Sequence, residues 1–278
     1  MTAAPQDNEP ALGSVENWIQ SQPAADITVE LSVVIPAYNE ERRLPPALVD
    51  IIDFCDSTLK TYEILVVEDG SHDNTADIVR KFERLRPQVR LISLPDNRGK
   101  GHAVRTGVVN ARGKLILFAD ADGATPIEEY LRLKQAIDSG ADIAFASRAL
   151  QSESTKVKTS WYRKYPGRIF NYAVNTLLLA GVADTQCGFK LFRGPAARFV
   201  FSQQTANRYS FDVEILYLAR LAGLRSSEVP VNWTNIPGSK VNLLLDSISM
   251  LIDVCKFKFL HRQINPEVFA EFLRKENA

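Results

Sequence analysis

The 278-residue sequence predicts an α/β protein with a mostly parallel central sheet and helices on both faces. Strand-like runs alternate with helical patterns through the first half of the chain, which is typical of parallel sheets. Each run is almost continuously apolar, as expected for strands buried on both faces. The hydrophobic fraction of 45% is sufficient for a substantial core.

Five strands are expected in the first half, and each ends at a polar or glycine-rich segment. They are "ITVELSVVIP" (27–36), "YEILVV" (62–67), "VRLISL" (89–94), "KLILFA" (114–119) and "DIAFAS" (142–147). Apolar residues at helical spacing predict helices over 44–55, 78–85, 103–108 and 126–138, the last with Pro126 in its first turn.

The second half is less regular. Strands are expected at "CGFKLFRG" (187–194) and "SSEVPVNW" (226–233). Helices are expected at 169–181, 211–223 and 241–262, and the basic, aromatic stretch 153–168 is expected to be a loop or a mobile helix. The domain boundaries predicted from this pattern are a mobile N-terminal tail (1–28), one catalytic-type domain (29–240), and a C-terminal amphipathic helix with a tail (241–278).

Composition excludes several classes of protein. The 33 basic and 33 acidic residues give a net charge of zero, which argues against nucleic-acid binding. The three cysteines lack metal or disulfide spacing and predict free thiols in a reducing, cytoplasmic compartment. No signal-peptide pattern and no apolar run of about eighteen residues occurs, and the three histidines are too scattered for a metal site or a Ser-His-Asp triad.

The segments that follow the five expected strands are "PAYNE", "EDGS", "PDNRGKG", "ADADGAT" and "SR". In open α/β sheets, ligands bind beyond the carboxyl ends of the strands. We therefore expect these polar segments to meet at one rim and to form the functional site.

Asp120 and Asp122 follow the fourth expected strand directly. Two adjacent carboxylates repel each other unless they share a proton or a cation. Carboxylates together with substrate phosphates are the usual ligands of Mg²⁺ or Mn²⁺, so the pair predicts a cation that holds a diphosphate. The structural alternative is an acidic turn that caps the helix beginning at Pro126.

Two neighbouring segments carry further candidates. Asp69, preceded by Glu68, is suited to accept a hydrogen bond from a nucleobase or a ribose, or else simply opens the turn at Gly70. The stretch "NRGKG" (97–101) offers backbone N–H groups and two cations to a phosphate or a base. It is neither a Walker loop nor a dinucleotide fingerprint.

Acidic and basic side chains also mark the second half. Asp212 and Glu214 begin an apolar helix, where a carboxylate is either a general base or a charge favoured by the helix dipole. A cationic set fits an anionic acceptor, or is a solvated basic face: Arg148, Arg163, Lys164 and Arg168.

The expected C-terminal helix has a narrow polar stripe on an otherwise apolar surface. The stripe consists of Asn242, Asp246, Ser249, Asp253 and Lys256. Burial of the apolar residues against the domain is one interpretation of this pattern. An interfacial helix on an anionic membrane is the other, because the helix ends in basic residues.

With these motifs in place, the sequence resembles the inverting glycosyltransferases of family two, which have the GT-A (Rossmann-like) fold. The shared motifs are "SVVIPAYNEE", "VVEDGSHDNT", "NRGKGHAVRTG" and "FADADGAT". The segments "DTQCGFKLF", "FDVEILYLA" and "EVPVNW…PGSKVN" are similar to the dolichyl-phosphate β-glucosyltransferase branch and its polyprenyl-phosphate relatives. The likeness runs in order from about residue 31 to about residue 260.

The resemblance implies roles for single residues. The nucleotide-sugar site would contain Pro36, Tyr38, Glu40, Asp69, Lys100 and Asp120, with Asp120 and Asp122 on the metal. Gly188 and Phe189 would line the sugar or acceptor pocket, and Asp212, with Glu214 second, would match the catalytic base. Arg148, Arg163 and Arg168 would bind the acceptor phosphate.

These roles imply a metal-dependent enzyme that moves glucose from UDP-glucose to a polyprenyl or dolichyl phosphate with inversion, using Mg²⁺ or Mn²⁺. The expected location is the cytoplasm, with peripheral contact to the cytoplasmic membrane face through the C-terminal helix. Transfer to a soluble or glycan acceptor is the alternative within the same class. A non-catalytic nucleotide-sugar-binding module is an alternative from another class.

Overall fold

The computed structural model describes residues 29–150, 152–158, 173–237 and 245–276. Seven strands form one sheet in the order β3-β2-β1-β4-β7-β5-β8. Their bounds are β1 Leu31–Ala37, β2 Tyr62–Asp69, β3 Val89–Leu94, β4 Leu115–Ala119, β5 Ile143–Ser147, β7 Phe189–Arg193 and β8 Ser226–Pro230. The five strands expected in the first half are thereby confirmed, as are the two in the second half.

The described sheet is parallel except for β7. This strand lies between β4 and β5 and pairs antiparallel with both. Its first residue, Phe189, is therefore opposite Ala119, the last residue of β4. As a result, the start of β7 lies at the same rim as the carboxyl ends of the parallel strands. A separate small sheet pairs β6 (Val157–Lys158) with β9 (Trp233–Thr234).

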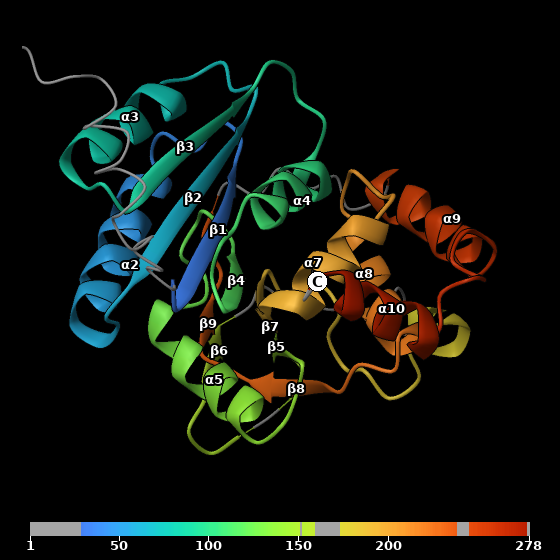
Figure 1. The fold of residues 1–278 in the computed structure, drawn as a ribbon. Coiled ribbons are helices and arrows are strands. Elements are labelled where there is room, and N and C mark those ends of the chain that lie inside the picture. The colour runs from blue at the N-terminus through green and yellow to red at the C-terminus, as the bar shows by residue number, and fades with distance from the viewer. Residues whose placement is uncertain (1–28, 151, 159–172, 238–244, 277–278) are drawn as a thin grey trace, which may run out of the picture.

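Helices cover both faces of the sheet, as the apolar strands predict (Figure 1). One core cluster joins the sheet to α2 (Leu44–Thr58), α3 (Thr75–Leu85) and α5 (Tyr130–Asp138). The other joins it to α4 (Lys100–Val109), α7 (Gly194–Gln203) and α8 (Phe211–Leu221). Neighbouring strand residues alternate between the clusters, since successive side chains point to opposite faces.

One boundary differs from the prediction. A 3₁₀ turn (Ile127–Glu129) follows Pro126 and precedes α5, so the proline starts this turn and not the α-helix itself. Residues 173–177 are helical, within the helix expected at 169–181. The tail 1–28 and most of the basic segment, with Arg163 and Arg168, lie outside the described residues.

The outermost layer consists of α9 (Leu245–Leu260) and α10 (Pro266–Glu276), which lie beyond α7 and α8 (Figure 1). Val254 and Phe257 of α9 belong to the core cluster around α8. The rings of α10 contact Phe199 of α7 at centroid distances of 5.1 and 5.3 Å. Both helices are therefore packed onto the main domain.

The surface of α9 corrects the simple burial interpretation of its polar stripe. Asp253, a member of that stripe, faces the domain and accepts a hydrogen bond from Ser210. Large apolar side chains lie exposed instead: Leu251, Ile252, Phe259 and Leu260. Within the described part of the chain, no helix is long and apolar enough to span a membrane.

Candidate active site

The polar segments predicted to converge do meet at one rim of the sheet. Strands β1, β2 and β4 are neighbours, and their carboxyl ends carry Tyr38, Asp69 and Asp120. Lys100 opens α4 beside them, and Asp212 lies in the first turn of α8. The rim therefore combines residues from both halves of the chain.

Asp120 and Asp122 lie at the end of β4, as predicted. The backbone N–H of Asp120 donates to the carbonyl of Gly188, which precedes β7, at 2.9 Å. A Cβ atom on Gly188 would lie 2.1 Å from Oδ2 of Asp120. Only glycine allows the carboxylate to lie so close to the β7 backbone, which is a physical reason for the "CGF" motif.

The two carboxylates fit a divalent cation. Burial and, after it, the charge of Asp120 raise the pKa of Asp122, while the charges of Arg43 and Lys100 oppose that rise. Hard carboxylate oxygens are the donors that Mg²⁺ and Mn²⁺ prefer. Among the described residues, no three His, Cys, Asp or Glu side chains form a metal-binding group. A cation here would depend on substrate oxygens and water as well as on this pair.

Lys100 lies between Asp120, which follows β4, and Asp212 of α8. Its Nζ lies 2.6 Å from Oδ1 of Asp120 and above the ring of Phe118, 5.2 Å from the ring centroid. Burial alone lowers the pKa of Lys100, but Asp120 and Asp212 outweigh this effect and the pKa is raised. The ammonium group is therefore held charged at the rim.

Asp212 pairs with Lys190, a residue that sequence reasoning missed. The ammonium group of Lys190 is fully buried; it donates to the Asp212 carboxylate and, at 2.6 Å, to the carbonyl of Cys187. Burial raises the pKa of Asp212, and the charges of Lys190 and Lys100 oppose that rise. The lysine within "CGFKLF" could have been found as a charge in an apolar strand, where burial requires a partner.

Asp69 organises the glycine-rich stretch 97–101. Its two carboxylate oxygens accept the backbone N–H groups of Arg98 and Gly99, at 3.0 and 2.8 Å. These two N–H groups therefore face Asp69, which differs from the expectation that they bind a phosphate or base. Gly70 has a φ of +69°, and a Cβ there would lie 2.7 Å from the backbone of Asn97. The turn after β2 consequently requires glycine.

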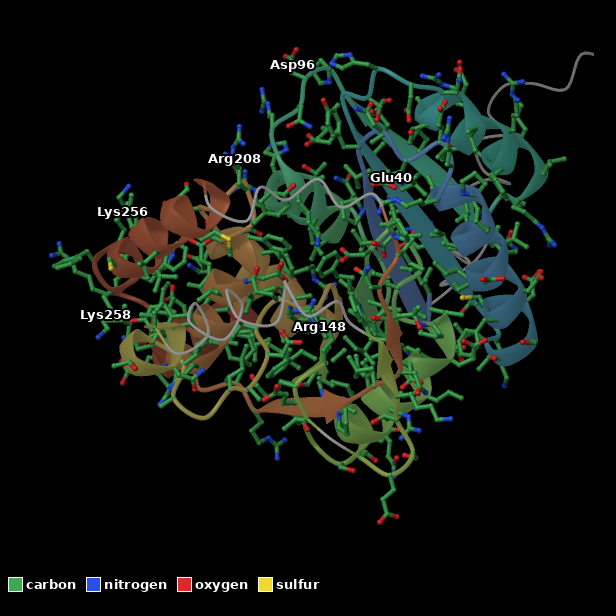
Figure 2. The ribbon with its side chains drawn as sticks, turned by 180° about the vertical axis from the view of Figure 1, so that it is seen from behind. Glu40, Asp96, Arg148, Arg208, Lys256 and Lys258 are labelled. Atoms are coloured by element: carbon green, nitrogen blue, oxygen red, sulfur yellow. The ribbon has the colours of Figure 1, made fainter. Side chains whose placement is uncertain are left out.

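The end of β1 contributes an ion pair. Pro36 is buried within the strand opposite Val67, and Tyr38 follows it, half-buried. The Glu40 carboxylate binds Arg43 through both oxygens, at 2.5 and 2.8 Å. Arg43 also lies 3.6 Å from Asp122. Glu40, labelled in Figure 2, thus holds the Arg43 guanidinium near Asp122, which follows β4.

Three predicted site residues have other surroundings than expected. Phe189 is 1% exposed within the core cluster under α5, a burial that does not fit a pocket lining. Arg148, at the end of β5, binds Asp184 through two nitrogens at 2.7 and 2.9 Å. Burial lowers the pKa of Arg148, but the charge of Asp184 raises it by more, so the net shift is upward. The positive charge of Arg148 is therefore largely neutralised by Asp184.

Glu214 is the third predicted site residue whose surroundings differ from the expectation. Its carboxylate accepts the backbone N–H groups of Thr205 and Ala206, at 2.9 and 2.8 Å, and lies 2.7 Å from Nε2 of His261. Burial would raise the pKa of Glu214, but these partners outweigh it and the pKa is lowered. Such a carboxylate supports the local structure. The contact with His261 joins residues far apart in the chain, which no sequence pattern indicated.

A mostly parallel central sheet flanked by helices on both faces is the architecture of GT-A glycosyltransferases. Glucosyl-3-phosphoglycerate synthase from Mycobacterium tuberculosis, solved with Mn²⁺, UDP-glucose and phosphoglyceric acid, has this fold. It is 18% identical to the chain, with a TM-score of 0.59, covering 82% of this chain and 80% of that one. The sequence profile of glycosyl transferase family 2 matches residues 32–201, and the chain belongs to this family.

Relatives with a stated activity are more similar in sequence. A dolichyl-phosphate β-glucosyltransferase of Dictyostelium discoideum is 41% identical over 243 residues, which cover 83% of this chain and 74% of the relative. The human dolichyl-phosphate β-glucosyltransferase is 40% identical over 227 residues, covering 77% and 70%. The family predicted from the motifs is therefore confirmed.

Proposed function

We propose that the chain transfers glucose from UDP-glucose to a polyprenyl phosphate of the dolichyl type, in a metal-dependent reaction with inversion. The observation that carries this proposal is the cluster of Asp120, Lys100 and Asp212 at the rim of the sheet. The names of the similar relatives support glucose as the sugar and dolichyl phosphate as the acceptor.

The donor half of the rim fits a nucleoside diphosphate sugar. An ionised carboxylate has about four lone-pair positions. Two of those on Asp69 accept backbone N–H groups, which leaves others for the imide N–H of uracil. Asp120 and Asp122 are the residues that would hold the cation. A bound divalent cation supplies positive charge that stabilises the leaving diphosphate.

Transfer then needs one bond to form and one to break. An oxygen of the acceptor phosphate attacks C1 of glucose from the face opposite UDP, and the bond between C1 and the UDP oxygen breaks. The products are UDP and a lipid-phosphate sugar of β configuration. The ammonium group of Lys100, held between Asp120 and Asp212, adds positive charge where the diphosphate leaves.

The role of Asp212 follows from the acceptor. A phosphate monoester is ionised near neutral pH, because its second pKa is about 6. No proton must then be removed before attack. Asp212 is fully enclosed and paired with Lys190, and it acts by holding Lys100 and the acceptor side of the rim in position. Arg163 and Arg168, outside the described residues, stay predictions as ligands of the acceptor phosphate.

The outer face of α9 suits a membrane that carries the lipid acceptor. Leu251, Ile252 and Phe259 are 40%, 50% and 79% exposed. Lys256 and Lys258 point outward from the same helix (Figure 2). Apolar side chains beside lysines are typical of helices that lie at the surface of anionic membranes. This contact would be peripheral and would bring the enzyme to its acceptor.

Incubation of the purified chain with Mg²⁺, UDP-glucose and polyprenyl phosphate tests the reaction directly. The expected product is a glucolipid labile to mild acid, formed at least tenfold faster than with GDP-mannose as donor. EDTA should abolish its formation, and added Mn²⁺ or Mg²⁺ should restore it.

The alternatives give different results in the same assay. Sugar transfer to 3-phosphoglycerate, without any glucolipid, would favour a soluble acceptor. Binding of UDP-glucose in calorimetry with no turnover of any acceptor would favour a non-catalytic module. Membrane contact is tested separately by co-sedimentation with anionic liposomes at low salt. Absence of the chain from the liposome pellet would contradict the role given to α9.

A further inference from the structure

Two polar contacts tie the surface helix α9 to the first turn of α8. The hydroxyl of Ser210, the residue before α8, donates to Oδ2 of Asp253 at 2.7 Å. Nε2 of His261, just after α9, lies 2.7 Å from Oε1 of Glu214. These contacts flank Asp212 on both sides along α8. The segment that carries Asp212 is therefore fixed from outside the sheet.

The contact at Glu214 reaches further into the rim. Its carboxylate also fixes Thr205 and Ala206. The adjoining Gln204 donates through Nε2 to the carbonyl of Gly101 at 2.9 Å. Gly101 follows Lys100 in the first turn of α4, so the same set of bonds supports the lysine at the diphosphate side.

These contacts are better suited to fixing a position than to adding stability. Ser210, Glu214 and His261 are 1%, 0% and 4% exposed, so their polar atoms have lost water. Buried polar pairs return little net stability compared with apolar residues of similar size, but they are strongly directional. The apolar contacts of α9, through Val254 and Phe257, do not impose such a direction.

We propose that Asp253 and His261 are positioning residues for catalysis, which makes α9 a working part of the active site. They act through Ser210 and Glu214 on the turn that holds Asp212. This inference rests on the proposed function in one respect, namely that Asp212 works in sugar transfer. The physical coupling between α9 and α8 is independent of which sugar or acceptor is used.

The test compares Asp253→Ala with Asp253→Asn, because asparagine keeps an oxygen that can accept from Ser210. Ser249→Ala, at an exposed position of the same helix, is the matched control. Glucolipid formation gives kcat and the KM for UDP-glucose, and amide hydrogen exchange reports on the peptide 204–216. Asp253→Ala should lower kcat at least tenfold, keep KM within twofold and speed exchange in that peptide. Asp253→Asn and Ser249→Ala should keep kcat within threefold of the original chain.

A normal kcat for folded Asp253→Ala overturns the proposal, as does an equal loss in Asp253→Asn. If Asp253→Ala does not fold, Ser210→Ala breaks the same bond from the other side and is judged by the same criteria. If the unaltered chain forms no glucolipid, the proposed function fails. The positioning role is then judged by exchange alone, and unchanged exchange in peptide 204–216 overturns it.

Discussion

Replacement of Gly188 by alanine should disable the site with little effect on the fold. The added Cβ would lie 2.1 Å from Oδ2 of Asp120, whereas ordinary contact begins at 3.4 Å. The carboxylate must therefore move by the difference, about 1.3 Å. The backbone cannot make room, because the N–H of Asp120 is bonded to the carbonyl of Gly188 itself.

A misplacement of about 1 Å at a reacting centre costs roughly 100-fold in rate. This loss corresponds to about 2.7 kcal/mol of transition-state stabilisation. Because the Asp120 side chain is 34% exposed, it can turn toward solvent, so the melting temperature should change little. We expect kcat/KM for UDP-glucose to fall about 100-fold, with weaker Mn²⁺-dependent UDP binding in calorimetry.

The same substitution in an Asp120→Ala background separates this explanation from general damage. Asp120→Ala removes the three carboxyl-group atoms that the new methyl group would meet at 2.1, 2.2 and 2.4 Å. Gly188→Ala should then reduce UDP binding by less than threefold beyond Asp120→Ala alone. Two results would refute the reasoning: activity of Gly188→Ala within threefold of the original, or full additivity of the two changes.

Three further predictions concern metal, stability and pH. Asp122→Asn should lower turnover at least 100-fold, and turnover should no longer rise when Mn²⁺ is added. Undiminished metal-dependent turnover in this variant would exclude a role of Asp122 in metal binding. Lys190→Met leaves a buried carboxylate without its closest cation and should cost about 3 kcal/mol in urea unfolding; a loss under 1 kcal/mol would contradict this. Burial raises the pKa of Glu63, but hydrogen bonds from Ser32 and Arg112 outweigh it and lower the pKa from its ordinary value of 4.5. The ionised Glu63 carboxylate therefore stabilises the fold above about pH 4.5, and this stabilisation is lost as pH falls through the folded-state pKa. In Glu63→Gln, the free energy of unfolding should depend less on pH in this range.

Most of the sheet was predictable because each strand carries its own local signal. The run "KLILFA" predicts both a buried strand and the place where the chain turns, and β4 ends at Ala119 accordingly. The direction of β7 was not predictable. Its antiparallel pairing depends on β4 and β5, which are distant in sequence, and no local pattern encodes that choice.

The candidate site was predictable where single motifs follow strands. Asp69, Lys100 and Asp120 fall into this group, and the structure brings them to one rim. Lys190 and His261 were missed, since their roles arise from partners 22 and 47 residues away. The sequence left two interpretations of the stripe on α9 open, because amphipathicity gives two faces without saying which one is buried. Asp253 lies on the inner face, where its carboxylate accepts a hydrogen bond from the hydroxyl of Ser210.

The candidate site draws on both sides of a boundary in the chain. The family profile ends at residue 201, after Asp69, Lys100 and Asp120. Asp212 in α8, and α9, which packs against α8, come after that boundary. The similar relatives match a longer part of the chain than the family profile does. Lys190 joins the two parts, because it lies in β7 of the family region and binds Asp212 beyond it. The buried bond from Lys190 therefore holds the first turn of α8 against the sheet of the family region.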